Sequence, residues 1–169
     1  MSDNIEILTS RFSLRTLDSS DNLEKYLSWV QDVSSNPFIM SARSDYTLDD
    51  LKTYVDQVNT NPEITFFGIF DRESKMHIGN IKFSQINAAI GSVEVGILIG
   101  EKEWRNKGAG QEVMIACNQW LKNQCSIQKV VLGVNSDNIS AIMLYRKLGF
   151  RQIDHAGLPI NSLRMELFL

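Results

Sequence analysis

The stretch from Val93 to Gly110 constrains the fold of this chain most strongly. It opens with seven residues, 93–99, that are apolar except for Glu94 and Gly96 and therefore predict a strand. A polar loop follows and ends in the sequence Arg-Asn-Lys-Gly-Ala-Gly at 105–110. Since the next fourteen residues place apolar side chains at helical spacing, the stretch predicts a strand, a loop and a helix in direct succession.

The loop before this helix has the chemistry of an anion site. Gly108 and Gly110 lack the Cβ atoms that would keep a ligand away from the backbone. The first turn of a helix offers free N–H groups and the positive end of the helix dipole. Because Arg105 and Lys107 add positive side chains, the sequence predicts a phosphate or pyrophosphate ligand here. A tight turn that needs glycine is the alternative interpretation.

Two common nucleotide motifs do not match this loop. The P-loop needs a glycine followed directly by Lys and then by Ser or Thr, and no segment of the chain has that pattern. The dinucleotide fingerprint needs a third glycine where Val113 stands, and its glycines should follow the strand directly. The pattern that remains is Arg-x-x-Gly-x-Gly behind an apolar strand.

A second group of residues, later in the chain, helps to interpret the Arg-x-x-Gly-x-Gly pattern. The apolar strand 130–134 is followed by residues at fixed spacing, namely Asn138, Ala141, Tyr145, Gly149 and Phe150. The two blocks together resemble the GNAT family of N-acetyltransferases. In that family Arg/Gln-x-x-Gly-x-Gly/Ala wraps the pyrophosphate of acetyl-CoA, and Asn-x-x-Ala-x-x-x-Tyr-x-x-x-Gly-Phe follows a later strand. The resemblance covers nearly the whole chain and is strongest from 93 to 150.

The N-terminal half is similar to one branch of that family, the RimJ/RimL-like enzymes that acetylate ribosomal proteins. The shared features are loose patterns at 11–15, at Trp29 with Asp32, and at Glu94 with Gly96. That branch also contains enzymes that acetylate amino sugars, polyamines and drugs. Membership in the branch therefore does not name the acceptor.

The remaining patterns predict the order β-α-α-β-β-β-α-β-α-β-β, which is the order of the family. This is an α/β (α+β) fold, a mixed and mostly antiparallel central sheet flanked by helices. With 169 residues, of which 43% are hydrophobic, we expect a single acetyltransferase domain over 1–169. The first strand is expected at 12–17, a helix N-cap within 18–21, and a capped helix from Thr47. A final strand pair is expected at 150–155 and 162–168.

The resemblance implies two catalytic residues. An amine must lose its proton before it attacks a thioester, and related proteins use a glutamate in the strand that contains Glu94, often through water. The alternative is that Glu94 faces solvent or binds a structural partner. Tyr145 occupies the family's position for the acid that protonates the departing CoA thiolate. Its alternative is an aromatic side chain packed in the core.

The resemblance also implies the contacts of acetyl-CoA. An oxyanion donor is expected on a backbone N–H between 98 and 100. The pantetheine arm is expected to pair with this strand where it parts from the next one. Asn138 is expected to cap its helix and to touch the cofactor. The implied acetyl-CoA-binding residues are Leu98, Ile99, Gly100, Arg105, Asn106, Lys107, Gly108, Ala109, Gly110, Asn138 and Tyr145.

Composition narrows the set of partners. The net charge of −3 gives no general attraction to nucleic acid or to anionic membranes, and we expect neither as a partner. No long apolar run or signal segment is visible, so a cytoplasmic protein is expected. Cys117 and Cys125 are predicted to be buried free thiols, without a metal site. The expected partners are acetyl-CoA and an amine acceptor, with the chain a monomer or a homodimer.

The sequence therefore predicts an N-acetyltransferase that moves an acetyl group from acetyl-CoA directly to a primary amine. The acceptor could be a protein N-terminus, an amino sugar, a polyamine or another small amine. A non-catalytic domain that senses acyl-CoA is the alternative, and a nucleotide-binding regulatory domain lacks a motif. Segments 34–46 and 87–92 are expected to shape the acceptor pocket, because loops on a rigid scaffold usually carry specificity.

Overall fold

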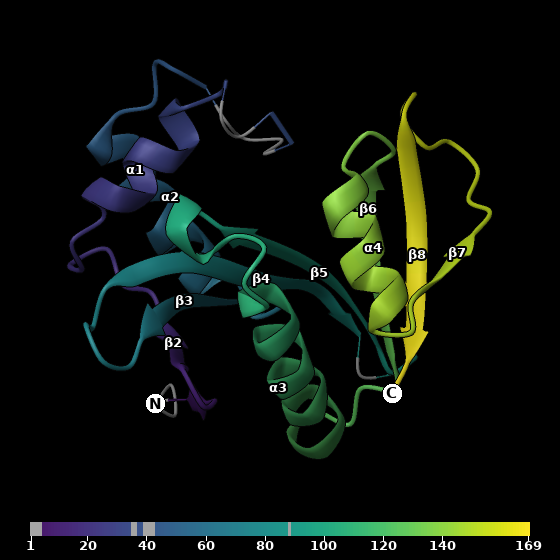
Figure 1. The fold of residues 1–169 in the computed structure, drawn as a ribbon. Helices are drawn as coiled ribbons and strands as arrows, with labels where there is room; N and C mark the ends of the chain where they lie inside the picture. The colour runs from purple at the N-terminus through teal and green to yellow at the C-terminus, as the bar shows by residue number, and fades with distance from the viewer. Residues whose placement is uncertain (1–4, 35–36, 39–42, 88) are drawn as a thin grey trace.

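The computed structural model describes residues 5–34, 37–38, 43–87 and 89–169. Figure 1 labels the helices and strands in this part of the chain. In order they are β1 (Glu6–Leu8), β2 (Phe12–Thr16), α1 (Glu24–Gln31), α2 (Leu48–Thr60), β3 (Thr65–Asp71), β4 (His77–Asn87), β5 (Ser92–Ile99), the 3₁₀ helix η1 (Lys102–Trp104), α3 (Ala109–Gln124), β6 (Lys129–Asn135), α4 (Ile139–Lys147), β7 (Arg151–Ile153) and β8 (Ser162–Phe168).

The strands of the described residues form one sheet in the order β1-β2-β3-β4-β5-β6-β8-β7. Neighbouring strands are antiparallel, except that β5 and β6 run parallel. A parallel pair needs a crossover, and α3 supplies it. The predicted mixed and mostly antiparallel sheet is therefore confirmed.

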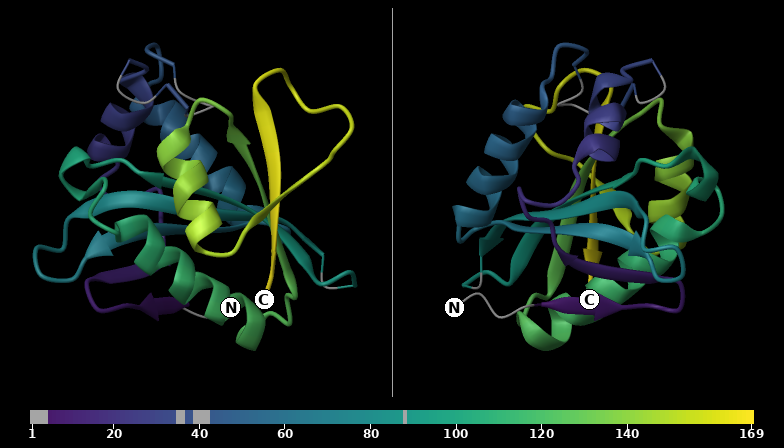
Figure 2. Two further views of the ribbon diagram at one scale, coloured as in Figure 1. Left: turned by 45° about the vertical axis from the view of Figure 1, so that its right-hand side comes forward. Right: turned by 90° about the vertical axis from the view of Figure 1, so that its left-hand side faces the viewer.

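The helices cover the two faces of the sheet separately (Figure 2). Buried residues of α3 and α4 join one hydrophobic cluster with the strands, and those of α1 and α2 join a second cluster. Because side chains alternate along a strand, β5 turns Val93 and Val95 toward α3 and α4. Glu94 and Gly96 consequently lie on the face that carries α1 and α2.

The parallel strands β5 and β6 separate halfway along their length. Their pairing starts at Ser92 with Lys129 and ends at Glu94 with Val131. The remaining residues of β5, 95–99, have no strand beside them on that edge among the described residues. Figure 1 shows the two strands diverging from this point. The predicted parting of the two strands is thus confirmed, and we call the gap in the pairing between β5 and β6 the opening of the sheet.

Some boundaries differ from the prediction. Strand β1 was not predicted, because three residues are too few to show an alternating pattern. The N-cap of α1 is Leu23 and does not lie within 18–21, because the carboxylate of Asp21 is held by Arg15 at 2.8 Å and by the backbone N–H of Asp18. Strand β7 is also shorter than predicted. The predicted capping box from Thr47 is present.

The packing of α1 on the sheet buries a histidine. We therefore expect the stability of the protein to depend on pH. His77 is 6% exposed, and its ring lies 4.9 Å from that of Phe70 and 5.0 Å from that of Trp29. Burial lowers the pKa of His77 although Asn80 contacts its Nε2. The folded state therefore favours neutral His77, and the stability that this provides is present above pH of about 6.5 and lost as the pH falls.

We expect the free energy of unfolding to fall by up to about 1.4 kcal/mol per pH unit below that point. Urea unfolding between neutral and mildly acidic pH measures this slope. The variant His77→Gln should flatten it, whereas His155→Gln, at an exposed position, should not. Equal slopes in the wild type and in His77→Gln would assign the acid sensitivity to other groups.

Candidate functional site

The loop that precedes α3 leaves the start of the helix open. Gly108 is the N-cap of α3 with φ +75°, and no side chain caps the helix there. A Cβ built on Gly108 would have only Arg11 Nη2, at 3.7 Å, within contact range. Asn106 also has a positive φ, of 58°. The backbone therefore turns sharply into an uncapped helix N-terminus with free space beside it, which is the geometry that an anion requires.

The second glycine of this loop also permits close packing of a neighbouring helix. A Cβ built on Gly110 would lie 3.1 Å from Leu144 Cδ2 on α4. That distance is tighter than nearly all real Cβ contacts, so Gly110 allows α4 to approach the first turn of α3. The motif therefore combines one glycine that has open space at its Cβ position with one that allows two helices to pack closely.

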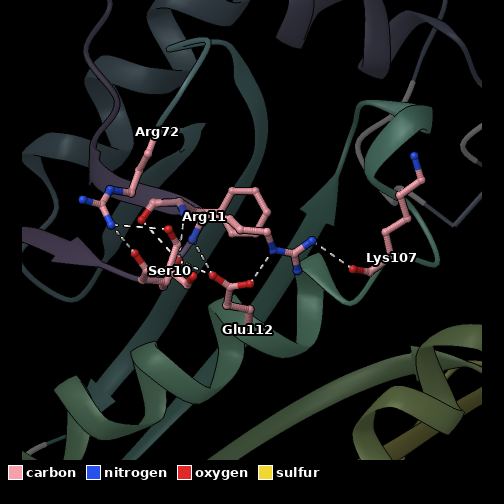
Figure 3. A network of polar contacts seen from close by, with 7 residues as sticks. Ser10, Arg11, Arg72, Lys107 and Glu112 are labelled. Atoms are coloured by element: carbon pink, nitrogen blue, oxygen red, sulfur yellow. Dashed lines mark hydrogen bonds and ion pairs between the residues drawn. The ribbon is translucent and has the colours of Figure 1, made fainter.

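A polar network fixes the start of α3 from the other end of the chain (Figure 3). Arg11 donates from Nε to Glu112 Oε2 at 2.7 Å and from Nη1 to the carbonyl of Lys107 at 3.1 Å. Thr9 donates to Glu112 Oε1 at 2.7 Å. Burial opposes ionisation of Glu112, but the hydrogen bonds from Thr9 and Arg11 lower its pKa overall. This role has no local signal in the sequence, because Arg11 and Glu112 lie 101 residues apart.

The end of β5 is held by a side chain that we expected on the cofactor. Arg105 donates from Nε to the carbonyl of Ile99 at 2.9 Å and from Nη2 to that of Gly100 at 2.8 Å. The N–H of Gly100 donates to the carbonyl of Ile78 at 2.9 Å, so it is engaged within the sheet. A Cβ on Gly100 would overlap the ring of Trp29. This strand end is therefore fixed before any ligand binds.

Helix α4 places two of the predicted residues on the same face as α3. Asn138 is the N-cap of α4, as predicted, and its Oδ1 accepts from the N–H of Ala141 at 3.2 Å. Tyr145 is 8% exposed, and its ring lies 5.7 Å from that of Phe150. Burial raises the pKa of Tyr145 to about 12, so its hydroxyl keeps its proton at neutral pH. No hydrogen bond joins that hydroxyl to a described residue.

The opposite face of the sheet carries the predicted carboxylate. Glu94 accepts two hydrogen bonds from Arg164 on β8, at 2.8 Å from Nη1 and at 3.1 Å from Nη2. Glu94 belongs to the last pair before β5 and β6 part, so this ion pair stands at the apex of the opening. Arg164 lies 70 residues away and has no local signal in the sequence. A fork of this kind fixes the orientation of the carboxylate.

Beyond the ion pair, the same face of the sheet is open around Gly96 and Gly133, and we call this surface the floor. Gly96 on β5 and Gly133 on β6 are exposed, and a Cβ built on either would have no atom within 4 Å. On the far side of Gly96, Lys82 of β4 lies in register with it and donates to the hydroxyl of Tyr54 at 3.2 Å. The structure thus brings together an uncapped helix on one face, an opening in the sheet, and a charged, open floor on the other face.

The two segments expected to shape the acceptor pocket are only partly described by the structure. Of the two segments expected to shape the acceptor pocket, residues 35–36, 39–42 and 88 lie outside the described residues. Cys117 is buried and Cys125 is half-buried, both as free thiols, and burial raises the pKa of Cys117 to about 12. Within the described ranges, no helix combines the length and the apolar character needed to cross a bilayer.

This chain is similar in sequence to known acetyltransferases. The model of the acetyltransferase (GNAT) domain matches residues 11–151. The protein described as uncharacterized N-acetyltransferase YobR of Bacillus subtilis is 32% identical over 89 residues, which are 53% of this chain. The match spans only 34% of the length of the Bacillus protein.

Solved structures share the fold at low sequence identity. Spermidine N-acetyltransferase from Vibrio cholerae, solved with CoA and spermine, has a TM-score of 0.81 at 22% identity, covering 94% of this chain and 96% of that one. A putative ribosomal-protein-serine acetyltransferase from the same organism has a TM-score of 0.80 at 16% identity, covering 100% of both chains. These likenesses concern the fold.

Proposed function

Because this chain belongs to the GNAT acetyltransferase family, whose members use acetyl-CoA, we propose that it transfers an acetyl group from acetyl-CoA directly to a primary amine. The observation that carries the proposal is the uncapped start of α3, with open space at Gly108, beside the opening between β5 and β6. The acceptor is a protein N-terminus, an amino sugar, a polyamine or another small amine. The RimJ/RimL-like branch and a single domain over 1–169 are part of this proposal.

The residues around α3 fit the donor. When bound, acetyl-CoA supplies an activated thioester. The backbone N–H groups of 108–110 would hold its pyrophosphate, with Asn106 and Lys107 completing the loop. The free edge of β5 at Leu98 and Ile99 would align the pantetheine arm as an added strand, with Arg105 and Gly100 fixing the strand end. Asn138 would border the arm from the start of α4.

Two side chains would move protons on opposite faces of the opening. Glu94 would take the proton from the incoming amine, directly or through water, with Arg164 holding its orientation. Tyr145 would give its proton to the leaving thiolate. Its raised pKa means that the hydroxyl carries this proton at neutral pH.

Ligand binding and thiol release together test this function. Acetyl-CoA should raise the melting temperature, whereas ATP and NAD should not, because a ligand that binds only the native state stabilises it. A set of N-terminal peptides, amino sugars and polyamines, followed by release of free CoA thiol, then identifies transfer. A thermal shift without thiol release for any amine would favour the non-catalytic acyl-CoA sensor. The absence of both would refute the proposal.

The role of Glu94 can be separated from a structural role. We expect Glu94→Gln to lower turnover by roughly 10²-fold, with unchanged affinity for acetyl-CoA. Glu166→Gln is the matched control, because Glu166 pairs with Lys129 on the same sheet at 3.8 Å. We expect Glu166→Gln to change only the melting temperature. If Glu94→Gln behaves in the same way, the carboxylate serves the ion pair with Arg164 and not the reaction.

A further inference from the structure

Not every charged side chain on the open floor has an ion-pair partner. Lys82 is partly buried, and its amino group contacts the hydroxyl of Tyr54, with the Tyr54 ring 5.7 Å away. No described carboxylate lies within ion-pair distance of Lys82. The other cation of the floor, Arg164, is already neutralised by Glu94. Glu166, two residues from Arg164 on the same face of β8, is likewise paired with Lys129. Lys82 thus faces the open space without a described carboxylate as its partner.

A partly desolvated cation without a counter-ion is unfavourable, and an anionic ligand would relieve that cost. Tyr54 cannot do so, because a neutral hydroxyl only solvates the charge. The floor between Lys82 and the opening is bare, since Gly96 is exposed and nothing lies within 4 Å of its built Cβ. A ligand group can thus reach the amino group of Lys82 from the side of the opening.

The register of the strands sets the spacing between Lys82 and the proposed base. Lys82 pairs with Gly96, and Glu94 lies two residues from Gly96 on the same face of β5. Diagonal neighbours of this kind are about 7–8 Å apart at Cα. An amine at Glu94 and an anion at Lys82 would therefore be separated by only a few bonds.

Resting on the acetyl transfer proposed above, we infer that the acceptor is a small amine that also carries a carboxylate or phosphate group, which Lys82 binds while Glu94 receives the amine. A polyamine fits this floor poorly. Its further cations would face Lys82, while Glu94 and Glu166 on this face are already paired with Arg164 and Lys129. The charge of the floor thus separates this chain from a purely cationic acceptor.

Matched acceptors test this inference. β-Alanine is compared with its amide, and aminoethyl phosphate with ethanolamine, so each pair differs in one anionic group. Spermidine supplies the polycation. For the wild type, kcat/KM should be higher for the anionic member of one pair by at least roughly 10-fold, and the pair that responds distinguishes carboxylate from phosphate.

Variants of Lys82 then test whether this side chain causes the preference for the anionic acceptor. Lys82→Met should reduce the ratio of kcat/KM between the anionic and the neutral member by roughly 10-fold, and Lys82→Arg should retain most of it. Lys122→Met, at an exposed site on α3, is the control and should leave the ratio unchanged.

The outcomes distinguish failure of the anionic-acceptor inference from failure of the proposed acetyl transfer. A wild type that binds acetyl-CoA but prefers the amide, ethanolamine or spermidine refutes the inference and leaves acetyl transfer standing. The same holds if Lys82→Met changes both members of each pair equally. A wild type that shows no thermal shift with acetyl-CoA and acetylates no amine refutes both.

Discussion

Substitution of Gly108 by valine should lower the affinity for acetyl-CoA by roughly 10²-fold or more. The free space beside Gly108 is where we place the pyrophosphate, and a branched side chain would stand between the phosphate oxygens and the N–H groups of α3. The residue also has φ +75°, where an L-residue costs about 1–2 kcal/mol and a β-branched one is a genuine outlier. Isothermal titration of folded protein measures the loss.

A second glycine separates strain from loss of the ligand site. Gly157 has φ +78° and no atom within 4 Å of its built Cβ, so Gly157→Val imposes the same backbone strain far from α3. We expect this control to lose stability but to keep its affinity for acetyl-CoA. Gly108→Ala should weaken binding less than Gly108→Val, because it adds one methyl group. Undiminished affinity in a folded Gly108→Val would place the anion elsewhere.

Replacement of Tyr145 by phenylalanine should reduce turnover by roughly 10-fold to 10³-fold while the melting temperature stays within a few degrees. The ring and its contact with Phe150 remain, so most of the buried area is kept. The hydroxyl is lost, and with it the proton that this position could give to the leaving thiolate. Because burial raises the pKa of Tyr145 to about 12, the wild type should show no loss of this acid below strongly alkaline pH.

The leaving group distinguishes a proton donor from a positioning group. A thioester with a more acidic thiol needs less protonation and should recover part of the rate of Tyr145→Phe. Tyr26→Phe, which removes a hydroxyl from a buried tyrosine of the second hydrophobic cluster, should leave the rate unchanged. An equal loss with every leaving group would mean that the hydroxyl positions the cofactor. A loss of stability without a loss of rate would make Tyr145 a core residue.

Local patterns in the sequence were sufficient for most of the fold. Helical spacing after Gly110, the capping box at Thr47 and the N-cap at Asn138 depend on residues within one or two turns, and the structure confirms all three. The Arg-x-x-Gly-x-Gly pattern likewise placed an uncapped helix start behind an apolar strand. Such features are readable because backbone dihedrals and hydrogen bonds between near neighbours determine them.

Only the tertiary structure decided what those residues contact. Glu112 meets Arg11 across 101 residues, and Glu94 meets a side chain 70 residues away on β8. Gly110 serves the packing of α4, and the side chain of Arg105 holds the end of β5. No local sequence pattern encodes these partners. The order of the strands in the sheet and the approach of α3 to α4 determine which side chains meet. Both follow from the burial of two hydrophobic clusters, one on each face of the sheet.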